Sequence, residues 1–102
     1  MSIQFRPLGK VREMVQAIGF DVSYAYDDLV FSDHSLFVIQ FDDKRSNVLK
    51  LYINVDCIMQ ESKRVEKLLG AEAQLAGLII EKMGTFSLSQ KEGTEELEVK
   101  FN

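Results

Sequence analysis

The chain has few of the residues on which cofactor sites and secreted folds depend. It contains one cysteine (Cys57), one histidine (His34), one proline (Pro7) and no tryptophan. A lone cysteine excludes an internal disulfide and a metal site built on paired thiols, so a reducing compartment, the cytoplasm, is the expected location. The sequence also has no glycine-rich loop of the P-loop or dinucleotide-binding type, and we therefore expect no cofactor.

Positive charge is scarce as well. Lysine and arginine number 12 against 16 aspartates and glutamates, which gives a net charge of -4 and a pI near 4.9. Non-specific affinity for nucleic acids comes mainly from clustered lysine and arginine, so we expect no nucleic-acid partner. Residues 1–10 hold no signal-like apolar run, and no uncharged stretch approaches the about 20 residues of a spanning helix, so we expect no membrane partner.

The bulk composition is that of an ordinary folded domain. The 102 residues are 46% apolar and 27% charged, far from the compositions that leave a chain disordered. Because single domains are typically built from about 100 to 150 residues, residues 1–102 are expected to form one domain with one core.

What the chain does contain is a series of apolar runs separated by aspartates. Between Arg12 and Lys44 there is no lysine or arginine, while six aspartates punctuate runs rich in valine, phenylalanine, tyrosine and isoleucine. Since aspartate is depleted in strands and favoured in turns, this pattern indicates an antiparallel meander with acidic corners. The predicted strands cover residues 21–26, 29–31, 36–41 and 48–55.

Apolar residues recur at helical spacing before and after this meander. The first stripe predicts a helix over residues 7–18, and the second covers residues 58–83, with Gly84 as its stop. A single helix over the second stripe would be about 39 Å long, so a bend or break near Gly70 is expected, and whether there is one helix or two stays open. A hairpin formed by residues 85–90 and 95–101 around a turn at residues 91–94 follows.

Together these elements predict an α+β fold: an antiparallel sheet of about five or six strands in a two-layer sandwich with helices, in the order α-β-β-β(β)-α-β-β. The helices are expected to cover the face that carries Phe37, Ile39, Phe41, Leu49, Leu51, Ile53, Phe86, Leu88, Leu97, Val99 and Phe101. Tyr24, Tyr26 and Tyr52 are expected on the other face or its margin, where each hydroxyl can reach water.

The residues that could carry catalysis form no specific signature. His34 lies between Asp33 and Ser35, but a hydrolase triad needs side chains that converge in space, and neighbours in a turn point in different directions. We interpret His34 as a solvated turn residue. Cys57 precedes a predicted helix whose dipole can lower its pKa, but with no second cysteine and one distant histidine we interpret it as a packed thiol. We therefore expect no enzyme.

Two aspartate pairs are the candidates for metal binding. Asp27-Asp28 and Asp42-Asp43 supply hard oxygen ligands, but they lack the alternating ligands, central glycine and closing glutamate of an EF-hand loop. We interpret both pairs as turn residues and expect no metal site.

Small residues gather in the second helical stripe. Small side chains let a helix approach another element closely, inside one molecule or across a twofold dimer contact, and periodicity does not distinguish these alternatives. The candidates for a dimer contact are Gly70, Ala73, Ala76 and Gly77.

Several strings resemble a known group of proteins. They are Val15-Gln-Ala-Ile-Gly-Phe, Tyr26-Asp-Asp-Leu-Val-Phe, Leu36-Phe-Val-Ile-Gln-Phe-Asp-Asp and Val48-Leu-Lys-Leu-Tyr-Ile-Asn. In their order they resemble the helix and three antiparallel strands of the type III secretion chaperone-like superfamily, which includes the bacterial sensory-transduction regulators. The resemblance implies a dimeric, non-enzymatic module that holds an extended segment of a partner. The segment 21–26 and the end at Asn102, where many members continue into another helix, depart from those chaperones.

The resulting hypothesis is a chaperone-like adaptor, a non-catalytic homodimer that captures an extended protein segment. Such a segment would add to a sheet edge, with backbone hydrogen bonds giving affinity and side-chain pockets giving choice. The expected partner-binding residues are Tyr24, Tyr26, Phe31 and Tyr52. The alternative is a small-ligand-binding or regulatory domain with a pocket between the sheet and the long helix.

Overall fold

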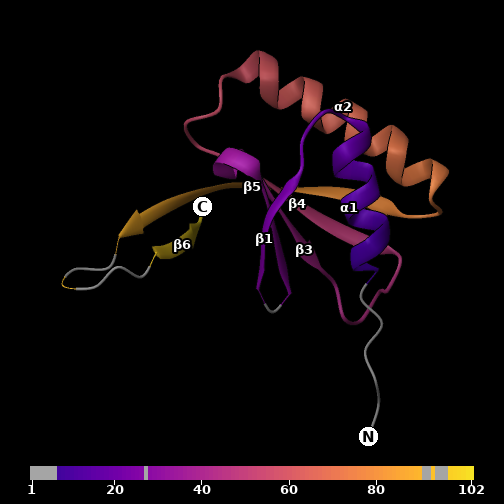
Figure 1. The fold of residues 1–102 in the computed structure, drawn as a ribbon, viewed down its shortest axis with the longest axis horizontal. Helices are drawn as coiled ribbons and strands as arrows, with labels where there is room; N and C mark the ends of the chain where they lie inside the picture. The colour runs from indigo at the N-terminus through magenta and orange to yellow at the C-terminus, as the bar shows by residue number, and fades with distance from the viewer. Residues whose placement is uncertain (1–6, 27, 91–92, 94–96) are drawn as a thin grey trace, which may run out of the picture.

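The computed structural model describes residues 7–26, 28–90, 93 and 97–102. Its elements are α1 (Leu8–Ala17), β1 (Val22–Tyr26), β2 (Leu29–Ser32), the short 3-10 turn η1 (Asp33–Ser35), β3 (Phe37–Phe41), β4 (Val48–Asn54), α2 (Met59–Leu75), β5 (Ile79–Gln90) and β6 (Leu97–Phe101). The predicted α+β fold and element order are confirmed (Figure 1). Apart from Gly93, the turn predicted at residues 91–94 lies outside the described residues, as do Asp27 and the side chain of Leu97.

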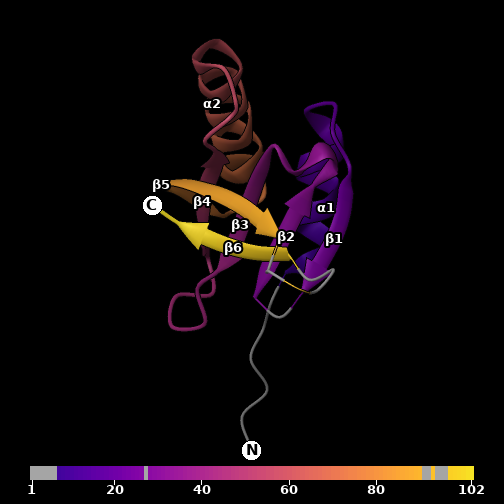
Figure 2. The same ribbon diagram turned by 90° about the vertical axis from the view of Figure 1, so that its left-hand side faces the viewer.

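The strands form one six-stranded sheet in the order β1-β2-β3-β4-β5-β6. Neighbouring strands are antiparallel except β4 and β5, which are parallel because α2 carries the chain back between them. The sheet is therefore mixed, where a purely antiparallel one was predicted. It curls into a half-barrel, so β5 and β6 sweep back across β2, with β1 and β6 as its two edges (Figure 2).

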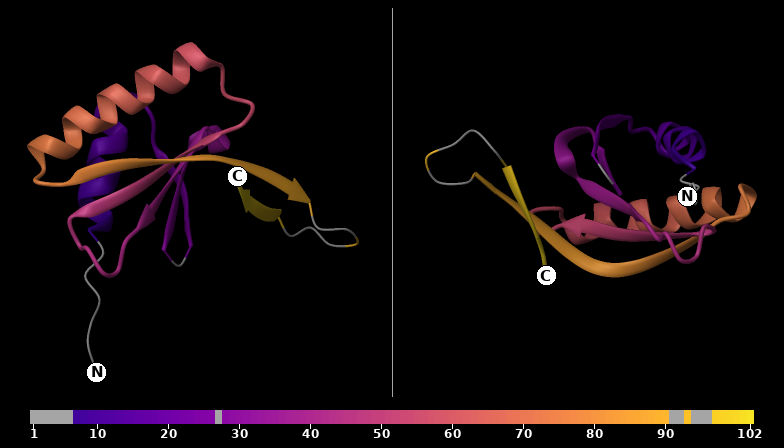
Figure 3. Two further views of the ribbon diagram at one scale, coloured as in Figure 1. Left: turned by 180° about the vertical axis from the view of Figure 1, so that it is seen from behind. Right: turned by 90° about the horizontal axis from the view of Figure 1, so that it is seen from below.

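Both helices pack on one side of this sheet, which we call the helix-covered face. Most residues of the main core there come from α1, α2, β3 and β4, and Val11, Ile39, Leu49 and Leu69 in it have no exposed surface. Figure 3 shows α2 running along β4 and the first part of β5, while β6 curls away on the opposite side. Within the described residues, no helix has the length and apolar character needed to cross a membrane.

The second helix ends earlier than the sequence predicted. α2 runs unbroken through Gly70 and stops at Leu75, and Gly77 follows with φ of 76°. The N–H of Gly77 bonds the carbonyl of Gln74 at 3.2 Å, and that of Leu78 bonds Ala73 at 2.8 Å, which is the Schellman pattern of a helix end. The stop predicted at Gly84 was therefore wrong, and the alternative of one helix or two is decided: the stripe holds one helix, unbroken at Gly70, and then the start of β5.

A bulge in β5 exchanges the two faces of that strand. Leu51 pairs with Lys82 but Tyr52 pairs with Gly84, so Met83 is an extra residue in the ladder. One extra residue sends every later side chain of a strand to the opposite face. The face predicted for Phe86, Leu88, Val99 and Phe101 was therefore wrong: they lie on the face away from the helices, where Phe86, Leu88 and Val99 form a second cluster with Phe31, Val38 and Tyr52.

Candidate functional site

The face away from the helices, which we call the concave face, contains a hollow of about 690 Å³. The curl of the sheet brings the β1–β2 hairpin opposite β5 and β6, and both pairs of strands line the hollow (Figure 2). Its apolar lining is Tyr24, Tyr26, Leu29, Phe31, Leu88 and Val99. The hollow is therefore a product of the tertiary fold, because residues about 60 positions apart form its two walls.

Aromatic rings from β1 and β2 form one wall of the hollow. Tyr24 and Tyr26 lie on the same side of β1, with ring centroids 6.3 Å apart and planes within 5° of parallel. The ring of Phe31 lies 6.0 Å from that of Tyr24 and is buried, with 7% of its surface exposed. Tyr24 and Tyr26 are 57% and 64% exposed, and exposure lets each hydroxyl reach water. In this wall of the hollow, Phe31 is therefore the buried ring, and Tyr24 and Tyr26 are the accessible ones.

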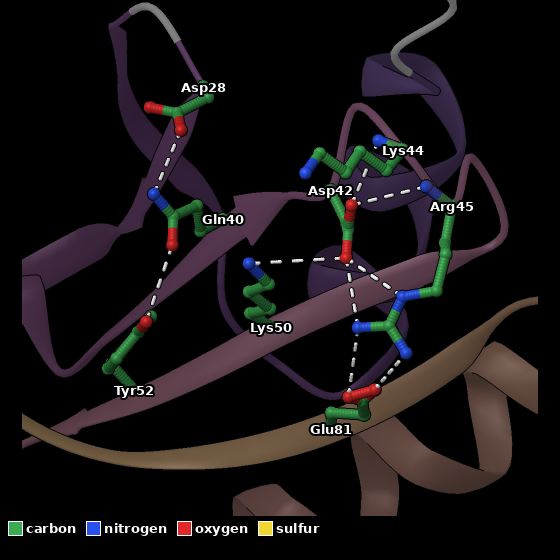
Figure 4. Close-up of polar contacts among 8 residues, drawn as sticks. All are labelled: Asp28, Gln40, Asp42, Lys44, Arg45, Lys50, Tyr52 and Glu81. Atoms are coloured by element: carbon green, nitrogen blue, oxygen red, sulfur yellow. Dashed lines mark hydrogen bonds and ion pairs between the residues drawn. The ribbon is translucent and has the colours of Figure 1, made fainter.

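Tyr52 belongs to the same face but has a different environment. Its ring lies 4.3 Å from that of Phe101, and its hydroxyl donates to Oε1 of Gln40 at 3.3 Å. Nε2 of Gln40 in turn donates to Oδ2 of Asp28 at 2.8 Å, so this chain of bonds crosses β4, β3 and the start of β2 (Figure 4). Of the four predicted partner-binding residues, the structure brings Tyr24, Tyr26 and Phe31 together in the hollow and places Tyr52 in the packing beneath it.

The polar groups of the hollow, apart from the tyrosine hydroxyls, come from three residues. The hydroxyl of Ser23 donates to the carbonyl of Ser32 at 3.0 Å. Ser35 lies in η1, and Glu98 lies on β6. Because side chains alternate along a strand and β6 pairs Val99 with Leu88 but Glu98 with Ser89, the Glu98 side chain lies on the face of β6 away from Leu88 and Val99.

A strained corner lies beside the hollow. His34 and Ser35 have φ of 60° and 49°, the left-handed region that non-glycine residues seldom adopt. The buried hydroxyl of Ser32 accepts the N–H groups of Leu36 and Phe37, both at 3.1 Å, and the side-chain amide of Asn54 donates to the carbonyl of Ser35 at 2.9 Å. These bonds hold the corner in place. His34 itself is exposed, consistent with its interpretation as a turn residue.

The other candidate chemical groups have local structural roles. Burial, and then the negative charge of Glu61, raises the pKa of Cys57, whose thiol donates to the carbonyl of Ile58 at 3.5 Å. A raised pKa keeps the thiol protonated, which is the opposite of what a nucleophile needs. Asp42 is a turn residue as predicted, because Oδ1 accepts the N–H groups of Lys44 and Arg45 at 2.9 and 3.1 Å.

Arg45 extends this turn into an ion-pair network. Its guanidinium lies 2.9 Å from Oδ2 of Asp42 and 2.8 Å from Oε1 of Glu81, and so connects the β3–β4 loop to β5 (Figure 4). The backbone N–H of Lys44, and then Arg45, lower the pKa of Asp42. Within the described residues, no three histidine, cysteine, aspartate or glutamate side chains gather in a group that could hold a metal ion.

The small residues of α2 and of the two positions after it do not form one surface. Ala73 is fully buried in the main core, which supports intramolecular packing for that residue. Ala76 packs partly against the same core, a Cβ added at Gly70 would meet no neighbouring atom within 4 Å, and Gly77 follows the helix end. Leu75, which lies between Ala73 and Ala76 in the sequence, is 83% exposed. A dimer contact at this end of α2 stays a prediction, with Ala73 outside it.

The two hollows described for this chain lie outside the space predicted for a pocket, between the sheet and the long helix. Buried side chains of α2, Val65, Leu69 and Ala73, occupy that space. A smaller hollow of about 570 Å³ lies between α1 and α2, lined partly by Met14 and Leu75. Leu88 and Val99, which line the larger hollow, were missed as site residues because their strand alternation did not reveal the bulge at Met83.

Comparisons with known proteins add no relative: no family model, curated protein or solved structure matches this chain. The resemblance to the type III secretion chaperone-like superfamily stays a prediction. Any function must therefore be inferred from the geometry of the molecule itself.

Proposed function

We propose that this protein is a non-catalytic, chaperone-like adaptor that holds an extended segment of a partner protein on the concave face. The observation that carries the proposal is the position of the hollow, between the two edge strands of a half-barrel and beside the exposed rings of Tyr24 and Tyr26. An apolar cavity next to an open strand edge offers both of the contacts that an extended segment needs.

Backbone pairing would take place along β1. This strand has five residues and a neighbour, β2, on one side only, so its outer backbone groups are available to another strand. A segment added there would run for about 17 Å, because a strand rises about 3.3 Å per residue. Alternate side chains of the segment would then enter the hollow, and the others would face away from it.

The tyrosines would supply most of the side-chain affinity. Fully burying an exposed apolar or aromatic side chain gains roughly 1.5–3 kcal/mol, and interface energy concentrates in a few such anchors. Phe31 would shape the surface that the segment contacts but would add little newly buried area, since its side chain is already buried. Because ordering the segment costs part of this gain, an affinity in the micromolar range is expected.

The test is selection of peptides from a displayed random library, followed by anisotropy titration of the selected peptides. The double variant Tyr24→Ser/Tyr26→Ser is expected to weaken binding at least about tenfold, since it removes two anchors. Met59→Ser is the matched control, because Met59 is also exposed but lies at the start of α2. Hydrogen exchange should show new protection of β1 amides. Binding that survives the tyrosine changes would contradict the proposal.

A small apolar ligand is the second candidate, and the size of the hollow favours it. Small-molecule sites typically have volumes of about 300–1,000 Å³, a range that includes the hollow at about 690 Å³. A compound that binds only the folded protein raises its melting temperature, so a thermal-shift screen tests this candidate. Hits abolished by Phe31→Ala, together with a displayed library that yields no peptide, would favour the small ligand over the segment.

A further inference from the structure

We infer that the segment held in the hollow enters it with an uncharged aromatic side chain, which packs against the ring of Tyr24 or Tyr26. This inference rests on the proposed function and specifies the chemistry of the partner. Three features of the described residues support it: the lack of charge facing the hollow, the engagement of polar groups in its lining, and a row of aromatic rings whose last members are exposed.

No charged side chain of the described lining points into the hollow. Glu98 is the only acidic or basic residue in that lining. Its neighbour Val99 pairs with Leu88 inside the hollow, so the alternation along β6 puts the Glu98 side chain on the other face of that strand. An ion that the segment carried into the hollow would lose water and gain no opposite charge, which is unfavourable for either sign. An uncharged side chain is therefore favoured.

Two polar groups of the lining are already engaged within the protein. The hydroxyl of Ser23 donates to the carbonyl of Ser32 at 3.0 Å. The carbonyl of Ser35 accepts the side-chain amide of Asn54 at 2.9 Å. A polar side chain of the segment would find few partners there, and a polar group removed from water without a partner weakens binding. An apolar side chain is therefore favoured over a polar one.

A row of aromatic rings runs from the second cluster into the hollow. The ring of Phe86 lies 6.5 Å from that of Phe31, and the two planes meet at 78°. Phe31 lies 6.0 Å from Tyr24, which lies 6.3 Å from Tyr26. All three separations are within the about 4.5–7 Å at which aromatic rings attract each other. The row is buried at the phenylalanines and more than half exposed at the tyrosines, so a further ring can extend it there.

The opposite wall of the hollow is aliphatic. It is formed by Leu88 and Val99, which face the tyrosines across the hollow. A ring that packs against a tyrosine can bury its far side on this wall. An aliphatic side chain of the same size would gain the same burial but would lack the contact between rings. Comparing two such side chains therefore isolates that contact.

The experiment uses hexapeptide pools with blocked termini, which carry fluorescein on a glycine–serine linker. One central position is phenylalanine, cyclohexylalanine, lysine, glutamate or alanine, and the other positions are a mixture of alanine, serine and threonine. Cyclohexylalanine has the carbon skeleton of phenylalanine without its aromatic electrons. In anisotropy titrations, the phenylalanine pool should bind roughly two- to tenfold more tightly than the cyclohexylalanine pool. The lysine and glutamate pools should bind no more tightly than the alanine pool, because neither charge finds a partner.

Two double variants assign the preference to the tyrosine rings. Tyr24→Phe/Tyr26→Phe keeps both rings and should keep the ratio of phenylalanine to cyclohexylalanine binding. Tyr24→Leu/Tyr26→Leu keeps an apolar wall without rings and should bring that ratio to about one.

Equal binding of the phenylalanine and cyclohexylalanine pools by the unchanged protein would overturn this inference and leave the proposed function standing. A phenylalanine preference that persists in the leucine variant would overturn it as well, as would a lysine or glutamate pool that binds as tightly as the phenylalanine pool. If no pool binds, the inference fails, and the displayed library then decides the proposed function separately.

Discussion

The two faces of the sheet carry similar apolar residues but differ in how completely the side chains are buried. On the helix-covered face, the side chains of Ile39, Leu49 and Leu51 have no exposed surface because α1 and α2 lie over them. On the concave face, Val38 and Phe86 are equally buried, yet Tyr24 and Tyr26 beside them remain more than half exposed. We therefore expect the helix-covered face to supply most of the stability, whereas the concave face leaves apolar surface exposed at Tyr24 and Tyr26.

The largest expected effect is on the helix-covered face. Leu69→Ala removes a fully buried side chain from between α2 and the sheet, and such changes cost about 2–5 kcal/mol of unfolding free energy. Urea denaturation would measure it. Tyr24→Ser is the comparison on the concave face and should cost less than about 1 kcal/mol, because the ring is mostly exposed. Equal losses of unfolding free energy in Leu69→Ala and Tyr24→Ser would contradict the proposed difference between the two faces.

The next largest effect is expected at Gly84, where β5 changes faces. Its φ is 151°, and a Cβ there would lie 2.9 Å from the carbonyl oxygen of Asn102. Gly84→Ala should therefore lower the unfolding free energy, measured by urea denaturation, by more than about 1 kcal/mol. Gly70→Ala is its control: this glycine is inside α2 with no atom near the added methyl, so a gain of about 0.5–1 kcal/mol is expected.

A smaller effect concerns acid. The pKa of Asp42 is lower in the folded protein than in the unfolded chain, so its contribution to stability is present above the unfolded value of about 4 and is lost as pH falls through the folded value. Asp42→Asn should flatten the loss of stability below about pH 4, measured as urea midpoints against pH. An Asp42→Asn variant that loses stability with acid as steeply as the unchanged protein would contradict this assignment.

The smallest effect on folding is expected at Leu75. This side chain is 83% exposed at the end of α2, so Leu75→Arg should change the unfolding free energy by less than about 0.5 kcal/mol. If the chain forms the predicted homodimer there, the same change should convert it to a monomer in sedimentation velocity. A dimer that persists in Leu75→Arg would place the contact elsewhere and make the concave face a candidate for it.

Much of the fold could be predicted because its signals are local. The aspartate corners separated β1 to β4 to within one or two residues, and Pro7 and Gly19 marked the ends of α1. The end of α2 was missed because Ile79, Ile80 and Met83 continue the helical spacing by chance. Only Gly77 signalled the change, and its role depends on a left-handed conformation that the pattern does not reveal.

The site could be predicted only in part, for a similar reason. Tyr24 and Tyr26 were found because alternation in a short strand between aspartates puts them on one face. Leu88 and Val99 were not found, since their position follows from one extra residue in β5 and from the curl of the sheet. Both are long-range properties that no local pattern specifies.

The open half-barrel also bears on how copies of this protein behave in concentrated solution. Among the described residues, β1 and β6 are the two edges of the sheet, and pairing β6 of one molecule with β1 of the next is a head-to-tail contact that can repeat from copy to copy. The surplus of acidic residues gives every molecule the same sign of charge and thereby keeps such edges apart. Near the pI of 4.9 that repulsion vanishes, and colloidal stability should be lowest there.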